Sequence, residues 1–172
     1  MTPKTKLFLG AALVVAVLDQ ATKLWVASTM SFADRFGVID GFFYITNVRN
    51  RGAAFSLFSE APAPVRLTLF VGITLVAIAL IISFYRRLAP GDRLSALSLG
   101  MILGGAVGNL IDRVSRGEVV DFLHFRLWGG YEWPDFNLAD SAIVVGVAFL
   151  IVELLATEGE TRSGPAGVEP GA

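Results

Sequence analysis

The sequence predicts an α-helical integral membrane protein with four transmembrane helices and a small β-structured outer loop. Hydrophobic residues make up 54% of the 172 residues, and the mean hydropathy is +0.64. Charged residues make up only 17%, whereas soluble globular domains carry about 25%. The apolar residues also come in four blocks, each with about the 20 residues needed to cross ~30 Å of hydrocarbon. These three observations place the chain in the membrane.

The four apolar blocks define one expected membrane domain of residues 1–156. The spans are expected at about residues 7–27, 65–85, 94–112 and 138–156. The basic start before the first block resembles a secretory signal peptide, but Val26-Ala27-Ser28 is a poor cleavage site. We therefore interpret the first block as a retained helix. The second block contains no acidic residue and is interpreted as scaffold.

Four spans place both termini on the same side of the membrane. Short segments on that side are dense in positive charge: Lys4, Lys6, Arg86, Arg87 and Arg93. Positive charge near the ends of spans favours the cytoplasm, so we expect cytoplasmic termini. The outer loops are then residues 28–64 and 113–137. Residues 157–172 contain several Gly and Pro residues and are expected to form a disordered cytoplasmic tail.

The two outer loops differ in composition. In the first, Phe42–Thr46 is aromatic and β-branched and is bounded by Gly41 and Asn47, which predicts a short strand. The second contains an amphipathic aromatic set suited to the membrane interface. Its members are Val119, Val120, Phe122, Trp128, Tyr131 and Trp133.

Several classes of site are excluded by composition. The absence of cysteine excludes disulfides and thiolate nucleophiles. The single histidine, His124, excludes His-rich zinc sites, and we interpret it as an incidental surface or interface residue. A net charge of −1 gives no indication of nucleic-acid binding. We expect no metal and no other cofactor.

Polar side chains recur inside three of the four apolar blocks. Ionisable groups in hydrocarbon cost roughly 2.5–3.5 kcal/mol each, so they usually mark function. At 1.5 Å per residue, Asp19 lies ~18 Å along the first span and Asn109 ~22 Å along the third. Asp140 lies in the first turn of the fourth. All of them fall toward the outer face, which predicts a single polar site there.

Spacing within the spans predicts how these groups are held. Asp19 and Lys23 are four residues apart, so they are expected to form an intrahelical ion pair that supports the site. Gly100, Gly104 and Gly108 form a stripe of small residues that lets another helix approach closely. That packing would press the polar residues that follow the stripe against neighbouring helices.

Two carboxylates, Asp121 and Asp140, are the best candidates for chemistry. If they share a partly buried site, repulsion raises one pKa, so one acid is protonated while the other is ionised. The ionised acid can activate a water for attack on a peptide carbonyl, and the protonated acid can donate to the carbonyl oxygen. Paired acids also serve proton relays and helix packing, so spacing alone leaves these alternatives open.

Two other functions fit some of the residues. A serine–lysine peptidase would require Lys23 as its base, with Ser56 as a candidate nucleophile, but Asp19 would hold the lysine proton in place. A small proton-coupled carrier would also keep acids in its helices. Carriers tend to place those acids at the midplane of broken, repeated helices, and neither feature is visible here.

Five ordered sequence blocks resemble blocks of bacterial lipoprotein signal peptidase, also called signal peptidase II. They are Leu18–Lys23, Asn50–Ser56, Gly104–Arg113, Val119–Phe122 and Phe136–Asp140. The resemblance implies an aspartic endopeptidase of the bacterial cytoplasmic membrane with its active site near the outer leaflet. It implies that the enzyme removes the signal peptide from diacylglyceryl-modified prolipoproteins by cutting before the lipidated cysteine.

The resemblance also implies roles for individual residues. Asp121 and Asp140 would be the catalytic acids. The substrate-binding and supporting residues would be Asp19, Lys23, Asn50, Gly52, Asn109, Asp112, Arg113 and Asn137. Asp112 is expected to act as support, in a helix-end ion pair with Arg113. The first outer loop would form a small β-cradle over the site.

The expected partners follow from the same resemblance. They are lipid-modified prolipoproteins, membrane lipids and inhibitors of the globomycin type, a cyclic peptide antibiotic. No nucleic acid is expected, and the protein is expected to be a monomer.

Overall fold

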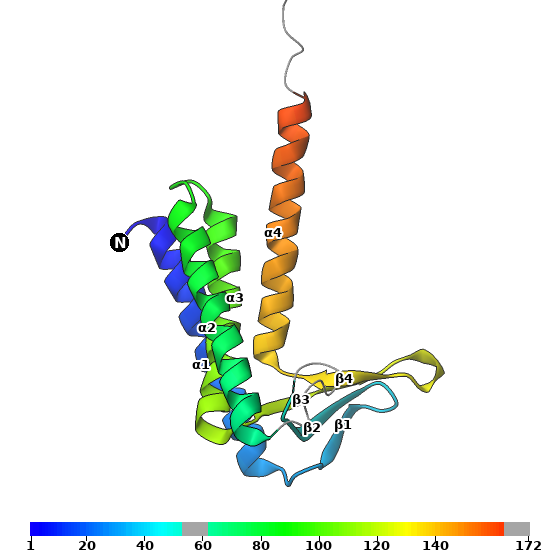
Figure 1. Cartoon of the computed structure of the whole chain (residues 1–172). Helices are drawn as coiled ribbons and strands as arrows, with labels where there is room; N and C mark the ends of the chain where they lie inside the picture. Colours follow the sequence, from blue (N-terminus) through cyan, green and yellow to red (C-terminus); the bar gives the residue numbers. More distant parts are fainter. Residues whose placement is uncertain (53–61, 164–172) are drawn as a thin grey trace, which may run out of the picture.

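Four long helices and one small sheet make up the computed structural model, which describes residues 1–52 and 62–163, with side chains to residue 156. The helices are α1 (Pro3–Thr29), α2 (Ala63–Arg87), α3 (Arg93–Arg116) and α4 (Leu138–Ser163). Each contains a stretch long and apolar enough to cross a membrane. The sheet lies at one end of the helices (Figure 1). The predicted fold class is confirmed.

Helix α3 is the central helix, and its glycines set how closely the others approach. A Cβ atom added to Gly104 would lie 2.6 Å from the carbonyl oxygen of Ala12 in α1. One added to Gly105 would lie 2.5 Å from the carbonyl oxygen of Ala139 in α4. Both separations are too short for any side chain, so α1 and α4 contact the α3 backbone directly. The predicted close-packing stripe is confirmed.

The sheet has four antiparallel strands in the order β1-β2-β3-β4. They are β1 (Arg35–Ile39), β2 (Phe43–Asn50), β3 (Val119–Arg126) and β4 (Glu132–Phe136). The segment between α1 and α2 thus contributes a hairpin, of which only part of β2 was predicted. The segment between α3 and α4 contributes β3 and β4, which the sequence analysis did not predict.

The missed strands have a physical explanation. The aromatic and β-branched residues of β3 suited a membrane interface equally well, because a single segment cannot reveal its pairing partner. The pairing is long-range: Tyr44 of β2 lies opposite His124 of β3. His124 is only 5% exposed, so the interpretation of a surface residue is wrong.

Two helices extend beyond their expected ends. The third span was expected to end at Asp112, but α3 continues to Arg116 and ends at Gly117, whose φ of 74° is left-handed. This is the usual glycine stop of a helix. Helix α4 continues to Ser163, past the start of the expected disordered tail. Residues 164–172 lie outside the described part.

The arrangement brings one end of each element to a single region. Helices α1 and α3 end beside the sheet, while α4 begins there directly after β4 (Figure 1). The N-terminus and the far end of α4 lie at the opposite end of the bundle (Figure 1). Polar residues near the sheet end of the helices can therefore meet residues of the strands.

Candidate active site

The start of α4 is fixed by a reciprocal pair of hydrogen bonds. The backbone N–H of Asp140 donates to Asn137 Oδ1 at 3.0 Å, and the backbone N–H of Asn137 donates to Asp140 Oδ2 at 3.3 Å. An amide residue followed three positions later by an acid forms such a capping arrangement, which satisfies backbone donors of the first turn. The local sequence thereby holds the Asp140 carboxylate at the positive end of the helix.

Asp121 is almost completely buried in β3. Its side chain accepts two hydrogen bonds from amides: Asn137 Nδ2 to Oδ1 at 2.7 Å, and Asn50 Nδ2 to Oδ2 at 2.9 Å. Burial is the main cause that raises the pKa of Asp121, to about 7, and nearby Asp140 raises it further. The hydrogen bond from Asn50 acts in the opposite direction. At neutral pH this carboxyl group therefore retains its proton in much of the population.

Two amide side chains connect the two candidate acids. Asn109 in α3 donates from Nδ2 to Asp140 Oδ1 at 2.8 Å. Its Oδ1 accepts from Asn137 Nδ2 at 3.2 Å, and that same nitrogen donates to Asp121. The chain Asp140–Asn109–Asn137–Asp121 therefore joins α3, α4 and β3. The sequence-predicted acids do meet in one site, linked by neutral donors.

Lys23 is fully buried behind this chain of amides. Its ammonium group lies 2.8 Å from Asp19 Oδ2 and 3.0 Å from Asp112 Oδ2, and it donates to Asn109 Oδ1 at 2.8 Å. Three acceptors match the three N–H donors of the ammonium group. The predicted Asp19–Lys23 ion pair is confirmed. Through Asn109, Lys23 also orients the amide that contacts Asp140.

The two carboxylates that flank Lys23 each anchor the backbone next to a candidate catalytic acid. Asp19 Oδ1 accepts from the backbone N–H of Ala139, which precedes Asp140, at 2.9 Å. Asp112 Oδ2 accepts from the backbone N–H of Val120, which precedes Asp121, at 3.2 Å. We refer to Asp19, Lys23 and Asp112 as the Lys23 cluster. It ties α1 and α3 to both elements that carry the acids.

The expected ion pair between Asp112 and Arg113 is replaced by others. Asp112 pairs with Lys23 and, one helical turn onward, with Arg116 at 3.8 Å. Neighbouring residues on a helix point in different directions, so the partners lie three or four positions apart or on another helix. Arg113 donates to the carbonyl oxygen of Asn109 at 3.3 Å and interacts electrostatically with Asp140 and Asp121.

Asn50 is oriented by the turn that follows β2. The backbone N–H of Gly52 donates to Asn50 Oδ1 at 3.0 Å, which leaves Nδ2 facing Asp121. Gly52 thus acts through its backbone. Residues 53–56 of the Asn50–Ser56 block, including the alternative nucleophile Ser56, lie outside the described residues.

Two further residues contribute to the site, although the sequence analysis assigned them no role in it. Gln20 Nε2 lies 3.2 Å from Asp19 Oδ2 and donates to the carbonyl oxygen of Gly108 at 3.0 Å. A Cβ atom at Gly108 would collide with the Asp19 carboxylate, so glycine is needed there. The position of Gln20 next to Asp19 in the sequence was the signal that could have indicated its role. The role of Gly108 toward Asp19 required the packed helices.

The described residues offer one kind of chemistry here. Among them, no group of three or more His, Cys, Asp or Glu side chains is placed to hold a metal ion. Asp121 carries a proton near neutral pH, and Asp140 lies at the positive end of a helix, where an anion is stabilised. Such a pair of unlike carboxyl groups is suited to general acid–base catalysis.

Comparison with known proteins assigns the family. The family model described as signal peptidase (SPase) II matches residues 11–156. A lipoprotein signal peptidase of Geobacter sulfurreducens is 46% identical over 158 residues, covering 92% of this chain and 97% of that protein. One of Bacillus pumilus is 44% identical over 151 residues, covering 88% and 94%.

A solved structure supports the same assignment. It is described as a bacterial membrane enzyme determined by the in meso method at 2.3 Å resolution. It superposes on this chain with a TM-score of 0.80 at 34% identity, covering 94% of each chain. Together with the family model and the curated relatives, this match shows that the chain belongs to the signal peptidase II family of peptidases.

Proposed function

We propose that this chain is a membrane-embedded aspartic endopeptidase that removes the signal peptide from diacylglyceryl-modified prolipoproteins, cutting before the lipidated cysteine. The family membership supports the reaction and the substrate class. The observation that carries the aspartic assignment is the chain of amides that links Asp121 to Asp140. It orients two carboxyl groups through neutral hydrogen-bond donors.

The raised pKa of Asp121 supports a role as the general acid, with Asp140 as the general base. Asp140, ionised at the start of α4, accepts a proton from water while the water oxygen attacks the scissile carbonyl carbon. Asp121 donates its proton to the carbonyl oxygen, which gives a tetrahedral diol. In the second step the protonated Asp140 delivers its proton to the leaving nitrogen. One diol hydroxyl returns a proton to Asp121 as the carbonyl re-forms, so the resting protonation is restored.

The remaining polar residues have positioning roles in this proposal. Asn50 and Asn137 hold both oxygens of Asp121, and Asn109 holds Asp140. The guanidinium of Arg113, which interacts electrostatically with both acids, would bind the substrate backbone together with Asn50. The Lys23 cluster would act only through the backbone and side chains that it holds.

The proposed orientation places the active site near the outer leaflet of the bacterial cytoplasmic membrane, with both termini in the cytoplasm. Its support is the distribution of positive charge. Basic residues gather at the N-terminus and on both sides of the turn between α2 and α3. Both segments lie at the end of the bundle opposite the sheet (Figure 1). A lipid-anchored substrate in the outer leaflet would then present its scissile bond close to the acids. We further propose that the chain acts as a monomer and binds globomycin-type inhibitors at this site.

The other two functions have less support. In a serine–lysine mechanism Lys23 must lose a proton, but it lies between two carboxylates that favour its charged form. A proton-coupled carrier would place its acids at the midplane, whereas these acids lie at the sheet end of the bundle.

The decisive experiment is cleavage of a diacylglyceryl-modified prolipoprotein by the purified protein in lipid nanodiscs, with the unlipidated precursor as a parallel substrate. We expect cleavage before the cysteine of the lipidated form only. Asp121→Asn and Asp140→Asn should stay folded and lose cleavage. Asp40→Asn, which changes an exposed acid in the turn before β2, is the matched control and should retain activity. Near wild-type cleavage by either active-site variant would refute the aspartic mechanism.

A further inference from the structure

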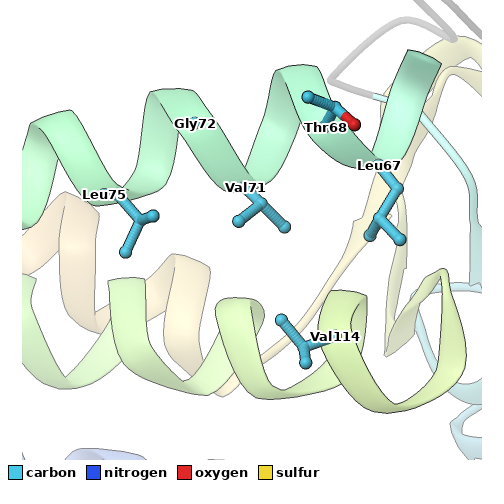
Figure 2. Close-up of a pocket in the computed structure, with 6 residues that line it drawn as sticks. All are labelled: Leu67, Thr68, Val71, Gly72, Leu75 and Val114. Atoms are coloured by element: carbon cyan, nitrogen blue, oxygen red, sulfur yellow. The ribbon is translucent and has the colours of Figure 1, made fainter. Parts of the chain in front are cut away.

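An apolar groove runs between α2 and α3, outside the polar site. Its volume is about 460 Å³. Figure 2 shows the side chains of Leu67, Val71 and Leu75 of α2 directed toward α3, where Val114 lies. The lining residues are Leu67, Thr68, Val71, Gly72, Leu75 and Val114. Thr68 carries the only polar side chain among them, so the groove suits a hydrocarbon ligand.

The length of the groove along α2 is close to the thickness of one membrane leaflet. Helix α2 begins at Ala63 at the sheet end of the bundle (Figure 1). At 1.5 Å per residue, Leu67 lies ~6 Å and Leu75 ~18 Å from that start. One leaflet of a bilayer with ~30 Å of hydrocarbon is about 15 Å deep. The groove therefore covers most of the leaflet on the same side as the acids.

The groove lies beside residues that reach the candidate active site. Val114, on its α3 wall, directly follows Arg113. The guanidinium of Arg113 lies 5.3 Å from the centre of the Phe70 ring, and Phe70 precedes Val71 on the opposite wall. Arg113 also interacts electrostatically with Asp140 and Asp121. The end of the groove at Val114 therefore lies next to Arg113, whose charge acts on both acids.

Gly72 lines the groove, and close packing of helices does not require a glycine there. A Cβ atom added there would meet nothing within 4 Å, whereas one added to Gly104 would lie 2.6 Å from the α1 backbone. Gly104 is therefore needed for close packing of helices, but Gly72 is not. Because Gly72 lines the groove and a Cβ atom added there would not collide with the protein, a larger side chain at this position would compete with a ligand for the groove.

We propose that this groove holds one acyl chain of the substrate's diacylglyceryl group. The proposal rests on the proposed function, since that substrate carries its acyl chains on the cysteine beside the scissile bond. A chain already dissolved in lipid gains little by moving into an equally apolar groove. The groove therefore acts chiefly by alignment: a chain lying along α2 fixes the lipidated cysteine near Arg113 and the scissile bond near the acids.

Gly72→Phe tests the proposal by filling the groove. Gly10→Phe is the matched control, because Gly10 is also a glycine of a membrane helix with nothing within 4 Å of an added Cβ. Both variants are assayed in nanodiscs on prolipoproteins that carry hexadecanoyl or butanoyl chains. We expect Gly72→Phe to lower kcat/KM for the long-chain substrate about tenfold, because a misaligned scissile bond reacts more slowly.

The short-chain substrate separates loss of the groove from a general defect. It cannot fill the groove, so wild type and Gly72→Phe should cleave it at the same rate, and Gly10→Phe should match wild type on both substrates. An equal loss on both substrates, or no loss on either, would overturn the groove assignment. Failure of wild type to cleave any lipidated precursor would instead refute the proposed function, so the two failures are distinguishable.

Photocrosslinking distinguishes the substrate's chain from bulk lipid. The inactive Asp140→Asn protein is mixed with a prolipoprotein whose acyl chains carry a diazirine, and crosslinks are mapped by mass spectrometry. We expect labelling within Leu67–Leu75 that an unlabelled lipidated substrate prevents. If phospholipid bearing the same diazirine labels this segment equally, and the substrate does not compete, then the groove belongs to bulk lipid and the proposal is wrong.

Discussion

Two pairs of aspartates lie within one connected polar network, but their surroundings differ. Asp19 and Asp112 are completely buried and share the ammonium group of Lys23. Asp121 and Asp140 instead accept hydrogen bonds from side-chain amides and a backbone N–H. A cationic partner stabilises the ionised carboxylate, whereas a neutral amide orients a carboxyl group and allows its charge to change. The same residue type is thus suited to support in one pair and to proton transfer in the other.

The two pairs are also connected in a specific way. Each supporting aspartate holds the backbone N–H directly before one candidate catalytic aspartate: Asp19 holds Ala139, and Asp112 holds Val120. The supporting pair therefore holds the backbone next to each member of the candidate catalytic pair. We therefore expect the supporting pair and the candidate catalytic pair to respond differently to substitution.

The largest effect is expected for removal of one proton-transfer group. Asp140→Asn keeps the size and much of the hydrogen bonding of the side chain, but it cannot accept a proton from water. We expect kcat to fall by about 10³-fold or more, in line with the loss of general acid–base catalysis. The thermal unfolding midpoint in nanodiscs should stay close to that of wild type. A large drop in that midpoint would show that Asp140 is a structural residue.

Removal of the shared cation should mainly affect stability. Lys23→Met leaves Asp19 and Asp112 as buried carboxylates without their cation, which typically costs about 3–5 kcal/mol. We expect a marked decrease in the free energy of unfolding, measured by denaturant titration in detergent micelles. The double variant Lys23→Met with Asp19→Asn should recover part of that loss, since it removes one uncompensated charge. Unchanged stability of the single variant would contradict the supporting role.

A smaller effect is expected at the anchor of β3. Asp112→Asn retains an oxygen that can accept from the Val120 N–H, whereas Asp112→Ala retains none. The loss of a buried acceptor typically costs about 1–3 kcal/mol. We therefore expect Asp112→Asn to keep substantial cleavage activity and Asp112→Ala to lose both stability and activity. Complete inactivity of a stably folded Asp112→Asn would move this residue into the catalytic group.

The smallest effect concerns pH. Asp121 must be protonated to donate, and its pKa is about 7, so kcat/KM should fall as pH rises through about 7. The hydrogen bond from Asn50 lowers this pKa. Asn50→Ala should therefore move the alkaline limb of the pH–rate profile to higher pH. A limb that stays in place, or moves to lower pH, would show that another group controls it.

The same pKa has a consequence for stability. The pKa of Asp121 is higher in the folded protein than the ordinary value of 3.8, so the folded state binds the proton more tightly. Ionisation then favours unfolding, and this group's contribution to stability declines as pH rises from about 4 to 7. Asp121→Asn should remove that part of the pH dependence, as read from unfolding midpoints across this range.

The membrane class, the four spans and the family could all be predicted from the sequence, because hydropathy is a local property and the five motif blocks are continuous segments. The sequence also placed the polar groups at one depth, since helix rise is fixed, and it predicted the Asp19–Lys23 pair from i,i+4 spacing. Strand β1 and the two strands of the second loop were not predictable in this way.

The partners of these polar groups across the molecule could not be predicted and became visible in the folded structure. The bond from Asp19 to Ala139 joins residues 120 positions apart, and Lys23 meets Asp112 on another helix. No local pattern specifies such partners, because they depend on how closely the helices pack. That packing is set in turn by glycines such as Gly104 and Gly108, where a single added carbon atom would collide with α1.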